Sequence, residues 1–330
     1  MTNPGPDTSI GIGVYRGSSV DISAITAYEE FLGMPSGSKV NYVLAYMADN
    51  PTWPQFENAV LAATTNGGPG VMKATDWVPA LGGRTLMLSV PACCQGTTWV
   101  DEASGKNDAH WVALTKTLVN NGLDMCHLRI AREFTGSWYR WNANPTNAVH
   151  YTAGYSHVCK VIRDNGFSGQ FIWNPYIGLG NFTSFAQITA LWPTWGNGNI
   201  GIDFYDGPSS HYPPGETIRT QAQQQAVWSD LLNGPGGLAN WRAFALSKKI
   251  ALCYPEWGLR AWNDAGVYKG GGDNALLIRE MSGWLKDTMP FMHAFWEDPV
   301  VGVMDPDWHP RRNVAVPAAR AEFLAQFGWT

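Results

Sequence analysis

The chain has 330 residues, of which 45% are hydrophobic and 15% are charged, so it can bury a large core and is not intrinsically disordered. Its formal net charge is -5 and it carries no block of Lys or Arg, which argues against nucleic acid as the main partner. No apolar run reaches the ~18 residues of a membrane-spanning helix.

The sequence holds no recognisable metal or cofactor motif, and we predict neither. The five Cys are an odd count, and no spacing between them matches a zinc site. Cys126, Cys159 and Cys253 lie within apolar patterns and are interpreted as core residues. Cys93 and Cys94 are adjacent, and the sequence does not decide whether they form a vicinal disulfide. The chain contains 17 Trp, which is a large number for 330 residues. We expect many of them to line a groove and several to lie in the core.

Residues 1–9 are expected to be a flexible N-terminal segment. No secretory signal is visible there, since the start of the sequence has no charged region and no apolar run. Beyond them, apolar strands alternate with amphipathic helices. Strands are predicted at 10–17, 40–47, 84–90 and from 125 onward, and helices at 22–32, 54–63 and 108–121. The first half of the chain therefore predicts four strand–helix units, the fourth helix running over 148–165 up to Gly166.

The same alternation continues in the second half. Strands are predicted at 170–176, 199–205, 249–254 and 289–296, and helices at 183–191, 218–232 and 238–247. Leu277, Met281 and Leu285 mark a further helix, and Pro317 opens the last one. Parallel strands need crossovers, which the helices supply.

Eight strands in strict alternation with helices predict a (β/α)8 TIM barrel, formed as a single domain over residues 1–330. The alternative is a doubly wound open sheet. That fold usually has a Gly-rich phosphate turn after its first strand, and GVYRGSS is a poor match to it.

Carboxylates stand at the predicted strand ends, where the chemistry of such barrels is found. They are Glu133 after the fourth strand, Glu256 after the seventh, Asp203 and Asp206 around the end of the sixth, Glu297 and Asp298 after the eighth, and Asp49 after the second. Glycoside hydrolysis needs two carboxylates across the scissile bond. Glu133 and Glu256 suit this role because strands four and seven face each other across the barrel mouth.

The stretch from Met125 to Trp141 ends in a loop rich in aromatic residues around Glu133. Flat rings beside an acid are typical of a sugar-cleaving site, although a buried strand with a surface Glu would give the same letters. Arg129 shares the strand parity of Glu133, so both should point into the barrel. Arg129 could keep a carboxylate ionised or form a structural ion pair. Arg132 should point away unless the strand end is bent.

The segment RIAREFTGSWYRW, residues 129–141, resembles the acid/base motif of glycoside hydrolase family 26, which contains β-mannanases and related retaining (β/α)8 glycanases. The segment PEWG from Pro255 resembles that family's nucleophile segment. The segment DFY from Asp203 resembles its sixth-strand motif, and Trp296 matches the eighth-strand Trp that floors the sugar site. The resemblance covers nearly the whole chain. Arg132 stands where the family has His and Ile130 where it has Pro, which puts mannan specificity in doubt.

The resemblance implies a retaining endo-β-glycanase. Glu133 would be the acid/base and Glu256 the nucleophile, with Arg129 and Tyr205 holding Glu256 ionised. The remaining expected site residues share a role in binding or supporting the sugar: Trp138, Trp257 and Trp296 as walls and floor, Trp141, Trp262 and Trp99 in outer subsites or else in ordinary packing, Asn174 at the sugar hydroxyls, and Arg132 and Asp203 as supports. The carboxyl groups would then lie ~5–5.5 Å apart.

Three alternatives stay open at this point. Glu133 could pair with Asp203 or Glu297 instead of Glu256. The barrel could bind carbohydrate without cleaving it. A metal-dependent hydrolase is the third, although the His residues are scattered along the chain: His127, His157, His211, His293 and His309. The expected partner is a polysaccharide, the expected state a monomer, and the expected place of action extracellular or at a cell wall, while sugar, linkage and localisation stay unknown.

Overall fold

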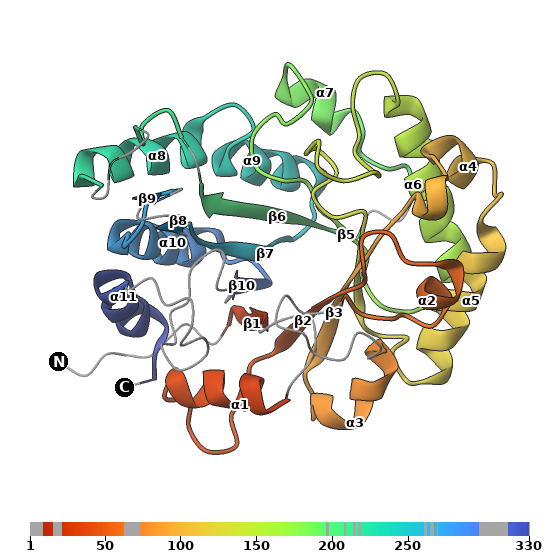
Figure 1. The fold of residues 1–330 in the computed structure, drawn as a ribbon, viewed down its shortest axis with the longest axis horizontal. Coiled ribbons are helices and arrows are strands. Elements are labelled where there is room, and N and C mark those ends of the chain that lie inside the picture. Colours follow the sequence, from red (N-terminus) through yellow and green to blue (C-terminus); the bar gives the residue numbers. More distant parts are fainter. Residues whose placement is uncertain are drawn as a thin grey trace.

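The computed structural model describes residues 9–15, 22–62, 73–195, 198–207, 209–213, 216, 219–260, 263–264, 267–268, 270–296 and 316–329. Eight parallel strands form a nearly closed barrel, and the helices lie around its outside (Figure 1). The fold is the (β/α)8 barrel predicted from the alternation of strands and helices.

The barrel strands follow one another around the ring in sequence order. They are β1 (Gly11–Tyr15), β2 (Tyr42–Tyr46), β3 (Thr85–Val90), β4 (His127–Ile130), β5 (Ile172–Trp173), β6 (Asn199–Asp206), β7 (Leu252–Leu259) and β10 (Met292–Trp296). Hydrogen bonding runs in the order β4-β3-β2-β1-β10-β7-β6-β5. The seam between β4 and β5 closes through a parallel bridge from Leu128 to Phe171.

The fifth strand is much shorter than the predicted 170–176. Pro175 has no N–H to donate to the ladder, and Asn174 uses its side chain within the barrel. Pairing resumes only as a bridge between Tyr176 and Asp203. The short β5 leaves the chain after Trp173 free to turn toward the barrel mouth.

The larger helices match the predicted ones closely. They are α1 (Ile22–Phe31), α5 (Asp108–Asn120), α6 (Ala148–Asp164), α7 (Phe185–Thr189), α8 (Gln221–Asn233), α9 (Leu238–Lys248), α10 (Ala275–Thr288) and α11 (Pro317–Phe327). The sequence did not indicate two short helices and a small hairpin: α3 (Val78–Leu81), α4 (Trp99–Ala103), and β8 (Asn263–Asp264) with β9 (Val267–Tyr268). The short helix α2 (Trp53–Glu57) overlaps only the start of a predicted helix.

The helix predicted over 54–63 is wrong beyond its first turn. Ala59 has a left-handed backbone with φ of 51°, which no α-helix accepts. Val60 and Leu61 then form isolated bridges to Lys73 and Met47. The segment is therefore a short capped helix followed by extended chain.

Two apolar clusters stabilise the barrel. The larger one lies between the strands and the helices. The smaller one comprises Tyr15, Leu44, Tyr46, Met87, Ile172, Cys253, Met292 and Ala294, which fill the barrel interior. All five Cys are buried free thiols, so Cys93 and Cys94 are not joined. Within the described residues, no helix is both long and apolar enough to cross a membrane.

Candidate active site

The chain bends sharply where β4 ends. Ala131 and Glu133 have left-handed backbones, with φ of 52° and 49°. Such angles are costly for residues other than Gly and cluster at functional sites. The bend turns the side chain of Arg132 inward, where its guanidinium lies 4.9 Å from the ring centroid of Tyr46 on β2. The sequence pattern alone placed Arg132 on the other side, and the bent strand end is the reason for the difference.

Glu256 on β7 is held by three donors. Its Oε1 accepts hydrogen bonds from the hydroxyl of Tyr46 and from Nη2 of Arg129, both at 2.7 Å, and its Oε2 accepts one from the hydroxyl of Tyr205 at 2.8 Å. The carboxylate is almost fully buried. Burial alone would raise its pKa, but Arg129 and Arg132 together with these donors hold the pKa of Glu256 below its ordinary value. Glu256 is therefore ionised at neutral pH.

Glu133 has a different environment. Its Oε2 accepts a hydrogen bond of 2.8 Å from the indole N–H of Trp138, and no cation contacts it within the described residues. Burial and the neighbouring charge of Glu256 raise the pKa of Glu133 to about 7, against the opposing effect of Arg132. Glu133 can therefore hold a proton near neutral pH and release it to a leaving group.

Asp203 on β6 is a third acid in the same place. One oxygen of each of Glu133, Asp203 and Glu256 lies within 4.8 Å of the others. Asp203 contacts Nη2 of Arg129 through Oδ2, while its buried Oδ1 has no hydrogen-bond partner among the described residues. Burial, opposed by Arg129 and reinforced by Glu256 and Glu133, holds the pKa of Asp203 well above its ordinary range. Asp203 therefore binds a proton more readily than an ordinary Asp.

Three carboxyl groups this close could in principle coordinate a metal ion. Here the guanidinium of Arg129 already contacts both Asp203 and Glu256 from the middle of the barrel. A divalent cation would have to share that space with a fixed positive charge. The residues of this site therefore fit a guanidinium and do not fit a metal.

Asn174 was expected to bind sugar hydroxyls, but its side chain is used inside the barrel. Its Oδ1 accepts hydrogen bonds of 2.8 and 2.6 Å from Nε and Nη2 of Arg129, and its Nδ2 donates to the carbonyl of Gly201 at 2.8 Å. The side chain is fully buried, so both ends of the amide are committed. Asn174 orients Arg129, which in turn orients Glu256.

Two of the aromatic residues expected in the site lie beside the carboxyl groups. Trp138 is 55% exposed and packs edge-on against Tyr176, with ring centroids 5.2 Å apart. Trp296 ends β10 and lies against the rings of Tyr15, Tyr46 and Tyr205 at 5.2–5.9 Å. Trp138 is therefore next to Glu133, and Trp296 packs on two of the Tyr residues that donate to Glu256.

Other predicted Trp residues lie elsewhere. Trp257 is fully buried on the helix side of β7, where it packs on Phe295 and Phe327 and its indole meets His293 at 3.2 Å. Trp141 is also fully buried, and its indole N–H donates to the carbonyl of Arg132 at 2.8 Å. Neither lines the mouth. The expectation that Trp257 forms a wall there is wrong, and of the two alternatives for Trp141 the structure shows ordinary packing.

Of the remaining Trp candidates, the structure describes Trp99 and not Trp262. Trp99 is buried and donates to the carbonyl of Trp141 at 3.0 Å, so it belongs to the packing layer. The residues Trp262, Glu297, Asp298 and His309 lie outside the described part of the chain. The alternative pairing of Glu133 with Glu297 is therefore not addressed by the structure.

Sequence reasoning missed three Tyr residues of the site. Tyr46 bridges Arg129 and Glu256, and Tyr176 flanks Trp138. Tyr139 accepts a hydrogen bond from Arg132 at its hydroxyl and faces the guanidinium with its ring. A signal for Tyr46 was present, because it ends a strand in phase with the interior Leu44. Tyr139 and Tyr176 lie on loops, where no periodicity indicates direction.

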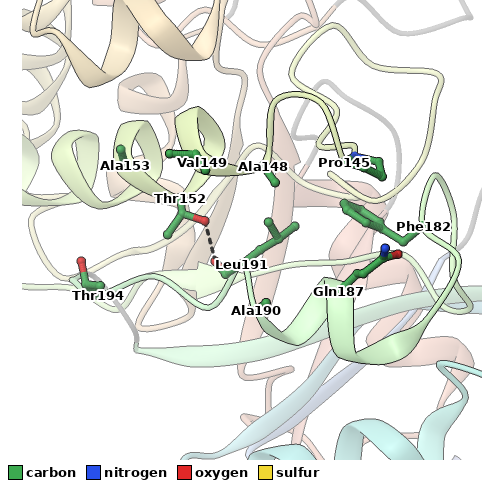
Figure 2. Close-up of a pocket in the computed structure, with 10 residues that line it drawn as sticks. All are labelled: Pro145, Ala148, Val149, Thr152, Ala153, Phe182, Gln187, Ala190, Leu191 and Thr194. Carbon is green, nitrogen blue, oxygen red and sulfur yellow. Dashed lines mark hydrogen bonds between the residues drawn. The ribbon is translucent and has the colours of Figure 1, made fainter.

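Hollows in the described surface include one of about 240 Å³ that adjoins the site and is lined by Tyr176, Tyr205, Ser209 and Asp230 among others. A larger one of about 590 Å³ lies between α6 and α7, where Ala148, Phe182 and Leu191 are among the apolar residues that line it (Figure 2). The larger hollow contains none of the residues described above, so the chemistry belongs to the barrel mouth.

Comparison with known proteins supports the fold. No protein-family model and no curated protein sequence matches this chain. Among solved structures, a modular endo-β-1,4-mannanase of glycoside hydrolase family 26 from Cellulomonas fimi matches with a TM-score of 0.61 and 14% identity, over 97% of this chain and 74% of that one.

Two further structures show the same likeness. The catalytic domain of a family 26 endo-β-1,4-mannanase from Bacillus sp. JAMB-750 matches with a TM-score of 0.58 and 12% identity, over 97% of this chain and 87% of that one. Cel5A from Thermotoga maritima, solved with mannotriose, matches with a TM-score of 0.55 and 12% identity, over 97% of each chain. The barrel is thus similar in fold to family 26 mannanases, which agrees with the resemblance seen in the motifs.

Proposed function

We propose that this protein is a retaining glycoside hydrolase that cleaves a β-linked polysaccharide by double displacement on Glu133 and Glu256. The observation that carries the proposal is the opposite protonation of two neighbouring carboxyl groups. Glu256 is held ionised by Arg129 and two Tyr hydroxyls, whereas burial keeps a proton on Glu133 up to about pH 7. Paired acids with pKa values driven apart are typical of glycosidases.

The short separation of the two acids supports retention of configuration. One oxygen of Glu133 lies within 4.8 Å of one oxygen of Glu256. Retaining enzymes hold their carboxyl groups ~5–5.5 Å apart, and inverting enzymes need ~6.5–9.5 Å to admit a water molecule. The gap here suits direct attack of Glu256 on the anomeric carbon and is too short to admit a water molecule between Glu256 and the sugar.

In the first step, the ionised carboxylate of Glu256 attacks the anomeric carbon while Glu133 gives its proton to the departing oxygen. The product is a glycosyl ester on Glu256 and a free sugar chain. In the second step, Glu133, now a carboxylate, takes a proton from water, which displaces Glu256. The proton returns to Glu133, so both acids recover their starting states.

The aromatic surfaces support a polysaccharide substrate. Trp138 and Trp296 present flat rings on either side of the carboxyl pair, and such rings pack on sugar faces. The structural neighbours named as endo-β-1,4-mannanases make β-mannan a natural first choice. Arg132 in place of the family's His leaves another β-glycan open.

The test is release of reducing sugar from a panel of β-mannans, β-1,3- and β-1,4-xylans, mixed-linkage glucan and actinobacterial cell-wall glycans. The wild-type protein should release sugar from one member, and Glu256→Gln should release none. The matched control is Glu30→Gln on the exposed face of α1, which should behave as wild type. Binding to one member without any release would instead favour a carbohydrate-binding barrel, and full loss in Asp203→Asn with activity kept in Glu256→Gln would reject the assignment.

A further inference from the structure

Arg132 is a buried cation in an aromatic enclosure. Its guanidinium lies 4.6 Å from the ring centroid of Tyr139, 4.9 Å from that of Tyr46 and 5.7 Å from that of Trp141. Nη2 donates to Asp49 Oδ1 at 2.8 Å and to the Tyr139 hydroxyl at 3.0 Å. Nη1 is buried and has no hydrogen-bond partner among the residues that the structure describes. Leaving such a donor unsatisfied is costly, so a structural role alone accounts poorly for it.

The enclosure connects directly to the carboxyl pair. Tyr46 is shared, since its ring faces the guanidinium of Arg132 while its hydroxyl donates to Glu256. The indole N–H of Trp141 donates to the backbone carbonyl of Arg132, and the next residue in the chain is Glu133. Contacts to the backbone and to the side chain therefore both hold Arg132 in place next to Glu133.

The other cation of the site serves different partners. Arg129 contacts Asp203, Glu256 and Asn174, and among the described residues it makes no hydrogen bond or ion pair with Glu133. Arg132 adds a second positive charge that acts on both Glu133 and Glu256, and its ion pair to Asp49 lies at the solvent edge.

We propose that Arg132 is a positioning residue of the catalytic centre, a fixed charge whose field acts on Glu133 without touching it. This inference rests on the proposed function for the role of Glu133 as the acid, whereas the experiment that tests it needs no substrate. A guanidinium stays charged at every working pH, whereas the His that the resemblance leads one to expect would gain and lose its charge near neutrality. Arg132 therefore gives the acid a constant electrostatic setting.

The direction of the effect follows from the charges that face Glu133. Glu256 on β7 and Asp203 on β6 stand on one side, Tyr176 after β5 adds a phenol, and Arg129 and Arg132 are the cations. Of the two cations, Arg132 has the larger effect on Glu133, and it lowers the pKa of that acid. Asp49 and Tyr139 face Arg132 itself, so removing the charge of Asp49 should strengthen the field.

The test is a ¹³C NMR titration of protein labelled at the Glu carboxyl carbon, with Glu133→Gln used to assign the signal of Glu133. In Arg132→Gln the titration of Glu133 should move upward by about one pH unit. In Arg132→Lys, which keeps the charge, it should stay within a few tenths of a pH unit of wild type, since Coulomb energy depends on charge and distance. In Asp49→Asn it should move downward, by less than in Arg132→Gln because Asp49 is largely solvated.

The opposite signs of the two neutral variants separate an electrostatic role from structural damage. An unchanged titration in Arg132→Gln, or a shift of the same sign in both variants, would overturn the proposal. If Arg132→Gln fails to fold, Asp49→Asn decides alone, and an unchanged or raised titration there rejects the field effect. Because no substrate is needed, this result stands apart from whether any glycan is cleaved.

Discussion

Among single residues, the division of labour between the two glutamates rests on their partners rather than on their depth. Both are buried, yet among the described residues Glu256 receives three donors and Glu133 one, the indole of Trp138. Burial without a paired charge raises a carboxyl pKa, and a guanidinium in contact lowers it. These partners therefore favour a protonated Glu133 and an ionised Glu256, which is what the proposed acid and nucleophile require.

This difference predicts a bell-shaped dependence of kcat/KM on pH. Activity should fall above about pH 7, as Glu133 loses its proton, and should fall below the ordinary range of a Glu, as Glu256 gains one. The profile is measured on the polysaccharide that the wild type cleaves. With an aryl glycoside whose leaving group needs no proton, Glu133→Gln should lose the alkaline fall. Persistence of that fall in the variant would assign it to another group.

Asp203 gives a second prediction at this scale. Because the pKa of its carboxyl is raised well above the ordinary range, Asp203→Asn should keep kcat within about tenfold of wild type, a loss that corresponds to one ordinary hydrogen bond. Glu256→Gln should lose about 10⁴-fold or more. Measuring kcat for both variants on one substrate checks the pair, and a larger loss in Asp203→Asn would make Asp203 the nucleophile.

The role of individual residues was only partly predictable from the sequence. Glu133, Glu256 and Arg129 were found because acids and an inward Arg mark strand ends. Trp257 was misplaced because the phase of β7 shifts at Pro255: Cys253 faces the barrel interior and so does Glu256, three positions on. The register of β7 against both neighbours is irregular there. Strand parity cannot reveal a bulge, so it cannot assign Trp257.

For the elements, the seam between β4 and β5 is the thinnest part of the barrel. Leu128 N–H donates to the carbonyl of Gln170 at 2.8 Å, and a single bridge completes the pairing. Gly169 lies where a Cβ would come within 1.8 Å of the carbonyl oxygen of Cys126, which is a backbone atom and cannot step aside. The close approach of the two segments depends on the absence of that side chain.

Gly169→Ala is therefore expected to lower the free energy of unfolding by about 1–3 kcal/mol, the usual cost of overpacking. Urea denaturation measures it, and hydrogen exchange should show faster opening of β4 and β5. Gly283→Ala in α10 is the matched control, because a Cβ there meets nothing within 4 Å. That control should be more stable than wild type by about 0.5–1 kcal/mol. An unchanged stability in Gly169→Ala would show that the seam can part without cost.

The elements themselves were the most predictable level. Each barrel strand and each long helix follows from apolar periodicity. The bend after β4 was not predictable, since neither Ala131 nor Glu133 is a residue that favours a left-handed backbone. The surrounding structure imposes those angles, and the sequence pattern carries no record of them.

For the molecule as a whole, the site costs stability. A carboxyl whose pKa is raised in the folded state binds more protons there than in the unfolded chain. Its contribution is fully present below the unfolded value and is lost as pH rises toward the folded value. For Glu133, this loss falls between about pH 4.5 and pH 7 and amounts to about 3 kcal/mol.

Glu133→Gln removes that proton linkage. Between pH 4 and pH 8, the variant should gain about 3 kcal/mol in free energy of unfolding relative to wild type. Urea denaturation of both proteins at the two pH values measures the difference. A constant difference across this range would mean that Glu133 titrates near the ordinary pKa of a Glu, and its role as acid would then lose its physical basis.

During turnover, Glu256 should form a covalent bond with the sugar. Wild-type protein should be quenched in acid while it turns over the polysaccharide that it cleaves, digested, and analysed by mass spectrometry. A peptide containing Glu256 should carry one added glycosyl unit or chain, and Glu133→Gln should not shift the adduct to another residue. An adduct on Asp203 or Glu133, or no adduct together with a product of inverted anomeric configuration, would contradict the account.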